Sequence, residues 1–278
     1  MRFLPGGVSK LRHLTGKGGA WLPVRLLVVA ALGNLGNRVL QMTGLVGSQP
    51  QVAMAGDAAL TMPGKVQRGL TLRHAARRFA ACSKGDDVHV EDFAEATEQM
   101  MTIVERFGSF TKRGVADVRQ NLKRVREKGR KGKSSMRAFL ADELRRGGVK
   151  PGGGPASRSG AEALLWARLV LSFWVEIFDE HVRHPRGKLA DETSRGFKRT
   201  LSRYLDNFSR AAFSMAMRQA PDWEDVRQRT SLGCSSAGTC SEDLLTEEMR
   251  HFVKDVRPVL DKMTALQKES GLEDPRTP

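Results

Sequence analysis

The chain has 278 residues, of which 40% are hydrophobic, and this is enough to bury one domain of about 200 residues with an extension, or two small domains. With one Tyr, few β-branched runs and abundant Ala, Leu, Arg, Lys and Glu, the composition favours an all-α protein over a β-rich one. The net charge of +15 indicates anionic partners, and nucleic acid, anionic membranes and phosphorylated ligands all meet that requirement.

The first 62 residues differ in composition from the rest of the chain. Six basic residues precede the first acidic one, Asp57, and Gly, Leu, Val and Ala are abundant. This pattern is typical of an organelle import leader, with a signal-type apolar region or a disordered tail as alternatives. The apolar run at 26–32 is too short to cross a bilayer by itself. We therefore treat residues 1–62 as an extension and place the folded domain at residues 68–275.

Apolar residues recur with the helical period of about 3.6 residues through most of the chain after a Gly/Pro break at 62–64. The pattern predicts helices at residues 70–81, 90–107, 112–128, 136–146, 161–182, 193–219 and 244–268. Between them, residues 83–87 form a turn, and 150–160 and 184–188 form loops. Ser134 or Ser135 caps the fourth helix, Pro221 stops the sixth, and Pro258 should bend the last.

The three cysteines, Cys82, Cys234 and Cys240, show no spacing that would bind a metal. Cys234 and Cys240 share a Ser/Gly-rich loop in which a local disulfide is an alternative, but we expect reduced thiols in an intracellular protein. No zinc site is predicted, because four histidines stand near charged residues without paired ligands: His74, His89, His181 and His184. We expect neither a metal nor a cofactor.

A polar cluster is predicted on one face of the helix at 112–128. Asp117, Asn121 and Arg124 fall at positions i, i+4 and i+7, so a carboxylate, an amide and a guanidinium project together. The opposite face carries an apolar stripe that can pack on a core: Val118, Leu122 and Val125. Such a face could recognise a polar headgroup, and the alternative is an ordinary solvated helix face.

The segment 161–182 is the most apolar helix that the sequence predicts. Its apolar residues cover more than one face, which indicates a central helix contacted from two sides. Trp166 stands near its start, followed by Leu169 and Phe173. Further along the chain, Trp223 is either an interfacial anchor or a core residue.

Three stretches carry a family resemblance, in order and with fitting spacing: FGSF…VADVRQNLKR, SGAEALLWARLVLSFWVEIF and GFKRTLSRYL…AAFSMAMRQAP. The first holds an Asp-x3-Asn-x2-basic spacing, and the Ala-Pro pair of the third lies 16 and 17 residues after Tyr204. With these motifs the chain resembles the glycolipid transfer protein family from about Leu70 to Pro275. Its layout is most similar to that of the ceramide-1-phosphate transfer proteins.

The resemblance implies an all-α, two-layer helical sandwich that encloses a hydrophobic lipid pocket, with a polar headgroup centre at the surface. By position, Asp117 and Asn121 match the family's pair that binds the headgroup and amide. Arg124 matches its basic residue, and Trp166 matches the Trp on which a sugar stacks. The residues expected to line the pocket for the lipid chains are Phe107, Leu169, Phe173 and Phe213.

The function implied by the resemblance is non-enzymatic transfer or sensing of a sphingolipid, either ceramide-1-phosphate or a simple glycosphingolipid. The implied protein is a cytoplasmic monomer that contacts membrane surfaces transiently, with organelle import through its first 60 residues as an alternative location.

Two positions depart from the family pattern. Leu205 stands directly after Tyr204, where the family has a His that donates to the ceramide carbonyl. The phosphate-binding branch has arginines where this chain has Glu162 and Trp166, and a Glu there would repel a phosphate.

Eight basic residues around the polar cluster could hold the protein on an anionic leaflet: Lys112, Arg113, Lys123, Arg126, Lys128, Arg130, Lys131 and Lys133. A nucleic-acid-binding helical protein is the alternative, but only the charge supports it, since the run at 123–133 has no interleaved aromatic residues. A degenerate family member with weak lipid binding is a second alternative, suggested by Leu205. An enzyme is not predicted, because no nucleophile stands beside a His base and no paired carboxylates stand out.

Overall fold

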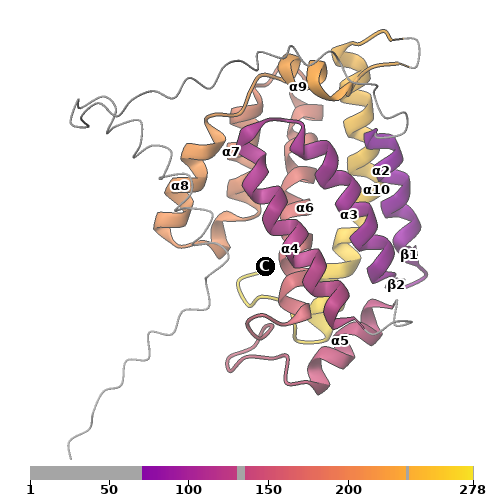
Figure 1. Ribbon diagram of the computed structural model, residues 1–278, viewed down its shortest axis with the longest axis vertical. Coiled ribbons are helices and arrows are strands. Elements are labelled where there is room, and N and C mark those ends of the chain that lie inside the picture. Colours follow the sequence, from indigo (N-terminus) through magenta and orange to yellow (C-terminus); the bar gives the residue numbers. More distant parts are fainter. Residues whose placement is uncertain (1–70, 130–134, 236–237, 278) are drawn as a thin grey trace, which may run out of the picture.

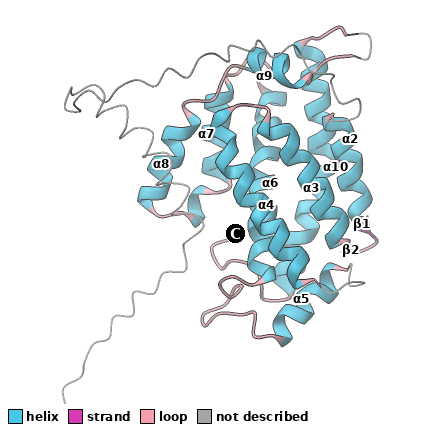
Figure 2. Cartoon of the chain, viewed as in Figure 1, coloured by secondary structure: helices cyan, strands magenta, loops and turns pink. Residues whose placement is uncertain are grey.

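The computed structural model describes residues 71–129, 135–235 and 238–277 as a mostly helical domain (Figure 1, Figure 2). The predicted extension at 1–62 lies outside the described residues, and so do Arg130, Lys131 and Lys133 of the basic run. Within the described ranges, every helix is too short or too polar to span a bilayer.

The elements follow one another in this order: α2 (Leu72–Cys82), β1 (Ser83–Lys84), β2 (Asp87–Val88), α3 (Val90–Glu105), η1 (Ser109–Thr111), α4 (Lys112–Lys128), α5 (Met136–Arg145), α6 (Gly160–Arg183), α7 (Leu189–Arg199), η2 (Ser202–Tyr204), α8 (Asn207–Met217), α9 (Trp223–Thr230) and α10 (Glu242–Glu269). Six of the seven predicted helices are present, each within two residues of its predicted ends. The predicted turn at 83–87 is the connection of the β1–β2 hairpin. Helix α10 continues through Pro258, and a bend there stays a prediction.

Helix α6 is the centre of the domain, because it contacts α4, α7 and α10. Helix α10 also packs along α2, which contacts α3, and α3 contacts α4. Figure 1 shows α3 and α4 in front of α6 and α10, so the helices form two layers. The side chains between them include fully buried phenylalanines: Phe79, Phe93, Phe107, Phe178 and Phe252. The prediction of a central helix contacted from two sides is therefore confirmed.

The start of α6 is fixed by side chains that satisfy its first backbone N–H groups. Ser159 is the N-cap residue, and its hydroxyl accepts from the N–H of Glu162. A carboxylate oxygen of Glu143 in α5 accepts from the N–H groups of Gly160, at 2.6 Å, and Ala161, at 3.1 Å. Because the first N–H groups of a helix have no partner within it, these bonds stabilise the start of α6 and hold α5 against it.

The single helix predicted at 193–219 is wrong, since the structure has α7, η2 and α8 in its place. The Thr200 hydroxyl donates to the carbonyl of Gly196, and α7 ends there. A new helix starts after Asp206, whose carboxylate accepts from the N–H of Ser209 at 2.7 Å. The Asp206 cap thus starts a separate helix, although the apolar spacing continues through the break.

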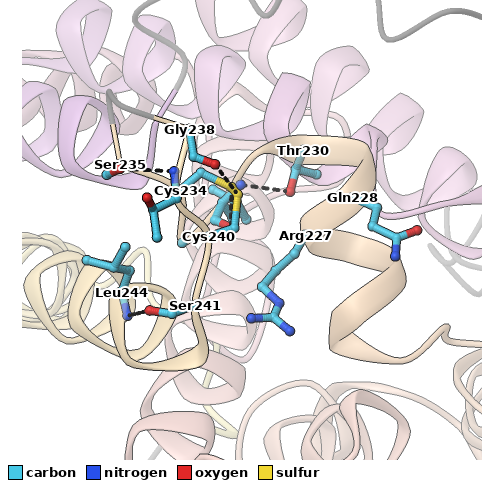
Figure 3. Close-up of a disulfide and its surroundings, with 12 residues drawn as sticks. Arg227, Gln228, Thr230, Cys234, Ser235, Gly238, Cys240, Ser241 and Leu244 are labelled. Carbon is cyan, nitrogen blue, oxygen red and sulfur yellow. Dashed lines mark hydrogen bonds between the residues drawn. A yellow bond between two sulfur atoms is a disulfide. The ribbon is translucent and has the colours of Figure 1, made fainter.

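Cys234 and Cys240 form a disulfide in the loop between α9 and α10 (Figure 3). The expectation of reduced thiols is therefore wrong for this pair, whereas Cys82 is free and buried. The backbone N–H of Ser235 donates to the carbonyl of Thr239 at 2.7 Å, which closes a tight turn and brings the two cysteines opposite each other. A Ser/Gly-rich composition does not reveal such a turn, so the sequence alone left the pairing open.

Trp223 begins α9, a short helix that the sequence analysis did not predict. Its side chain is 5% exposed, and the indole N–H donates to a carboxylate oxygen of Glu192 at 2.7 Å. The indole also packs against Phe107 and Phe178. The interpretation of Trp223 as an interfacial anchor is therefore wrong, and the core interpretation is confirmed.

Candidate functional site

The predicted polar cluster lies on α4, whose apolar stripe faces the core as expected. The stripe residues are each exposed by 1% or less: Val118, Leu122 and Val125. Asn121 is only 9% exposed, and its side-chain oxygen accepts from Nη1 of Arg124 at 3.5 Å. Asp117 lies one turn before Asn121, with its side chain 20% exposed. The three residues thus share a partly buried face, and their role in recognising a headgroup stays a prediction.

Asp117 is a carboxylate whose hydrogen-bonding capacity is unused. Its Oδ2 is buried and has no hydrogen-bond partner within the described residues. The neighbouring cation is Arg113, whose Nε lies 4.0 Å from Oδ1, and that Nε is also buried without a partner. Burial raises the pKa of Asp117 to about 6, and the charge of Arg113 offsets only part of this effect. A buried acceptor of this kind destabilises the protein unless a donor reaches it.

The first turns of α6 contribute Glu162 and Trp166, both partly buried and one turn apart on the same face. Glu162 accepts from the backbone N–H of Arg158 at 2.6 Å. Burial raises the pKa of Glu162, while this hydrogen bond and the charges of Arg124, Lys150 and Arg158 act in the opposite direction. Because Arg124 acts on Glu162, the polar face of α4 lies near this end of α6.

Three of the predicted chain-lining residues belong to a continuous row of rings in the core. Phe107 meets Trp174 at 5.3 Å between ring centroids, Trp174 meets Phe173 at 5.5 Å, and Phe173 meets Phe213 at 5.6 Å. Phe213 in turn stacks on Phe197 at 4.2 Å. Phe107 and Phe173 are buried, and Phe213 packs against the core from α8. The row joins the end of α3 to α6 and α8.

Leu169, the fourth predicted chain-lining residue, has polar surroundings on one side. It is buried, and it lines a pocket of about 290 Å³ between α6, α7, η2 and α10. Four arginines line the same pocket: Arg168, Arg199, Arg203 and Arg257. A contact between Leu169 and a lipid chain stays a prediction.

Comparison with known proteins decides the family. The family model of the glycolipid transfer protein (GLTP) matches residues 88–231 of this chain. The chain belongs to the glycolipid transfer protein family. Members of this family are transfer proteins and not enzymes, so the expectation of a non-enzymatic protein is confirmed. No curated protein matches the chain by sequence.

Solved structures show which fold this family member has. Human ceramide-1-phosphate transfer protein in complex with 12:0 ceramide-1-phosphate has a TM-score of 0.65 at 16% identity, over 74% of this chain and 99% of that chain. The fungal glycolipid transfer protein HET-C2 has a TM-score of 0.57 at 18% identity, over 69% and 94% of the two chains. Arabidopsis accelerated-cell-death 11 in its apo form has a TM-score of 0.58 at 16% identity, over 71% and 97%. The predicted helical sandwich of the glycolipid transfer protein fold is confirmed.

Leu205, where the family pattern has His, is a buried residue of this glycolipid transfer protein family member. It is 8% exposed and follows η2 directly. The Leu205 side chain has no hydrogen-bond donor, so any hydrogen bond to a ligand beside the end of η2 has to come from another group. The neighbouring Tyr204 is buried too, and its ring meets that of Trp166 at 6.2 Å between centroids.

Sequence analysis missed Arg168, which lies two residues after Trp166 in α6. Arg168 is only 3% exposed, and its guanidinium donates to both carboxylate oxygens of Glu273, beyond the end of α10. A lone basic residue in the most apolar helix was a signal for a buried ion pair, because a buried charge needs a partner. The sequence contained no indication of which acid would supply it.

Two cations of α4, Arg119 and Arg126, form ion pairs with acids of α3. Arg119 contacts Glu98 at 2.7 Å and Glu105 at 3.0 Å, and Arg126 contacts Glu91 at 3.1 Å. These pairs reduce the positive charge that α4 presents to an anionic partner. They weaken the nucleic-acid interpretation, which rested on charge alone.

Proposed function

We propose that this glycolipid transfer protein family member takes a sphingolipid from one membrane and carries it to another. The amide and headgroup bind at Asp117, Asn121 and Arg124, beside Trp166, and the hydrocarbon chains bind among the core rings. The observation that carries the proposal is Oδ2 of Asp117, a buried acceptor without a partner in the described part of the chain. A sphingolipid supplies an amide N–H and hydroxyl groups, which are donors of the matching kind.

The structural neighbours support this class of ligand. Human ceramide-1-phosphate transfer protein is in complex with ceramide-1-phosphate, FAPP2 is described as selecting simple glycosphingolipids, and HET-C2 is a fungal glycolipid transfer protein. Ceramide-1-phosphate and glycosphingolipids differ in headgroup but share a ceramide with one amide. We therefore assign the amide to Asp117 and Asn121, and the choice of headgroup to the side chains around Arg124.

The apolar row of the core offers the hydrocarbon chains a dry environment. Exposing a chain of about 16 carbons to water costs roughly 13 kcal/mol, at roughly 0.8 kcal/mol for each CH₂ group. The rings of Phe107, Trp174, Phe173 and Phe213 are in contact with one another, so a chain enters by separating them. Binding then replaces contacts between the rings by contacts between the rings and the hydrocarbon chain of the lipid. The near-UV circular dichroism of Trp174 should change as a result.

The surroundings of Arg124 favour an uncharged sugar headgroup over a phosphate. Glu162 lies in the field of Arg124, Lys150 and Arg158, and its negative charge offsets part of their attraction for an anion. Carboxylate and amide oxygens accept from sugar hydroxyls, and the partly buried Trp166 offers a ring face for stacking. We therefore expect a monoglycosylceramide to be carried faster than ceramide-1-phosphate.

Helix α8 offers a surface for contact with the membrane. Phe208 is 60% exposed and Met215 is 41% exposed, and the exposed Ala211 lies between them on the same face. Arg210 on the same helix and Arg218, the residue that follows its end, are also exposed. Apolar side chains flanked by cations suit the surface of an anionic bilayer, into which the rings and methyl groups insert.

A vesicle assay with the full chain tests the proposal. Donor vesicles carry either a fluorescent monoglycosylceramide or fluorescent ceramide-1-phosphate, and appearance of the probe in acceptor vesicles gives the transfer rate. We expect transfer of at least one probe and its loss in Asp117→Val, because Val has nearly the shape of Asp but accepts no hydrogen bond.

The matched control is Glu127→Gln, which removes an exposed carboxylate from the same helix. It should transfer at the wild-type rate. Equal rates for Asp117→Val and the wild-type chain would remove Asp117 from the site, and a wild-type chain that moves neither probe would refute the proposed function.

A further inference from the structure

The segment that follows α10, residues 271–277 and here named the tail segment, is packed into the domain. Leu272 is fully buried, and Glu273 and Asp274 are 8% and 6% exposed. A Cβ atom at Gly154 would lie 3.2 Å from the carbonyl oxygen of Glu273, so the tail segment approaches the backbone of the glycine-rich loop between α5 and α6. Figure 1 shows this segment returning past the lower end of α6 after α10 ends.

The tail segment is anchored by Arg168 of α6. The guanidinium donates to the two carboxylate oxygens of Glu273 at 2.7 and 2.8 Å, to Oγ1 of Thr264 at 2.6 Å and to Oε1 of Gln267 at 2.7 Å. Because a buried charge is stable only when its hydrogen bonds are made, this network fixes the place of the segment relative to α6 and α10.

From this anchor, hydrogen bonds lead to Tyr204. The Thr277 hydroxyl donates to Oε1 of Glu273 at 2.7 Å, so the Tyr204 hydroxyl, at 2.6 Å from Thr277 Oγ1, is the donor of the next bond. Arg276 donates from Nη1 to the Tyr204 carbonyl at 3.0 Å, and its guanidinium lies 5.3 Å from the ring centroid of Tyr204. The Tyr204 ring also meets the ring of Trp166, edge to face.

We propose that the tail segment is part of the headgroup site, in which Thr277 and Arg276 act as positioning residues that hold Tyr204 and, through its ring, Trp166. This inference rests on the proposed function, since Trp166 is assigned to the headgroup there. Tyr204 is held at its hydroxyl by Thr277, and at its carbonyl and its ring face by Arg276. These contacts restrict the orientation of the ring against which Trp166 packs.

The sharpest variant is Thr277→Val, which removes one hydroxyl and leaves the anchor in place. Its matched control is Thr264→Val, which also removes a hydroxyl from this network, but one that bonds Arg168 and the carbonyl of Leu260 and not Tyr204. We expect Thr277→Val to lower the transfer rate of fluorescent monoglycosylceramide by about two- to tenfold, the range that one uncharged hydrogen bond spans. The ratio of the monoglycosylceramide rate to the ceramide-1-phosphate rate should change with it, and Thr264→Val should leave that ratio unchanged.

Trp166 itself provides a measurement that needs no lipid. The chain has four Trp residues, so the signal of Trp166 is the difference between a chain with Trp166 and the same chain with Trp166→Phe. Quenching of this difference signal by acrylamide should increase in Thr277→Val and in Tyr204→Phe. The double variant should be no more affected than Thr277→Val alone, because Thr277→Val already removes the bond to the Tyr204 hydroxyl.

The results separate the two proposals. A wild-type chain that carries lipid, with unchanged Trp166 quenching and an unchanged headgroup ratio in Thr277→Val, would overturn the role of the tail segment and leave the proposed function intact. Equal effects of Thr277→Val and Thr264→Val on transfer and on melting temperature would reduce the segment to a structural element, and would overturn it too. A wild-type chain inert toward both lipids contradicts the proposed function itself.

Discussion

Replacing Asp117 by Asn should make the folded protein more stable and its lipid transfer weaker. Burial raises the pKa of this carboxyl from 3.8 to about 6, so the folded state disfavours the charged form. Between these two values the folded state binds more protons than the unfolded state, and the free energy of unfolding therefore falls as the pH rises through this window. Above about pH 6 the full destabilisation by the charge is present.

The size of the effect follows from the shift. A difference of about two pKa units corresponds to about 3 kcal/mol, and this is an upper value because the side chain keeps 20% exposure. Asn removes the charge but still buries a polar amide, which costs about 1 kcal/mol or more. We expect Asp117→Asn to raise the free energy of unfolding by about 1–2 kcal/mol at pH 7.5. At pH 4 the contribution of the charge nearly vanishes, since Asp117 is then neutral in the folded state, and the cost of the buried amide should leave the variant no more stable than the wild-type chain.

Urea unfolding at the two pH values measures this difference, and the vesicle assay measures transfer by the same preparations. Glu127→Gln serves as the control, because Glu127 is exposed on the same helix and its removal should change neither quantity. A stabilised Asn variant with slow transfer would mark Asp117 as a residue kept for binding at the expense of stability. An Asn variant less stable than wild type at pH 7.5, or a gain of the same size at both pH values, would refute the assigned cause.

Three further substitutions test other parts of the molecule. Arg168→Gln should lower the free energy of unfolding by about 3–5 kcal/mol in urea, because Glu273 keeps a buried, uncompensated charge; a loss no greater than that of an exposed arginine would contradict this. Phe208→Asp should weaken binding to anionic vesicles about tenfold in a flotation assay, with an unchanged melting temperature, since Phe208 is 60% exposed; unchanged flotation would exclude α8 as the contact surface. Leu205→His should speed transfer of amide-bearing lipids by adding a donor, and no gain for any of them would mean that the amide carbonyl is not bound beside the end of η2.

The helices that carry the candidate site could be predicted from sequence because their signals are local. Helix α4 has the predicted ends, since its apolar spacing runs from Val115 to Val125 and no Pro interrupts it. The start of α6 was predictable to within one residue from the Ser159 that caps it. A buried face and a cap depend on neighbours within one or two turns, and the sequence lists those neighbours directly.

The helix predicted at 193–219 was wrong because two local signals, the apolar spacing and a helix cap, conflict there. From Phe197 to Phe213 the apolar spacing continues as in one helix, but α7 ends before Thr200 and the Asp206 cap starts a separate helix. The apolar period shows which side chains face the core. A break in the helix that leaves the same side chains facing the core does not change this period, so the period does not reveal the break. The break matters for the site, because it places Tyr204 at the end of the short helix η2 and Leu205 in extended backbone, instead of in one long α-helix.

The polar partners of the site could not be predicted, because they are distant in sequence. Arg168 and Glu273 are separated by 105 residues, and nothing near Glu273 distinguishes it from the other acids of the chain. The composition of α6 does require some acid at Arg168, since a guanidinium in a buried helix is stable only as an ion pair. The sequence thus shows that Arg168 needs an acidic partner, but only the fold shows that this partner is Glu273. The hydrogen bond from Thr277 to Glu273 also places Thr277 beside Tyr204. The pairing that stabilises the core is therefore also the one that brings the tail segment to Tyr204, whose ring packs on the Trp166 proposed to bind the headgroup.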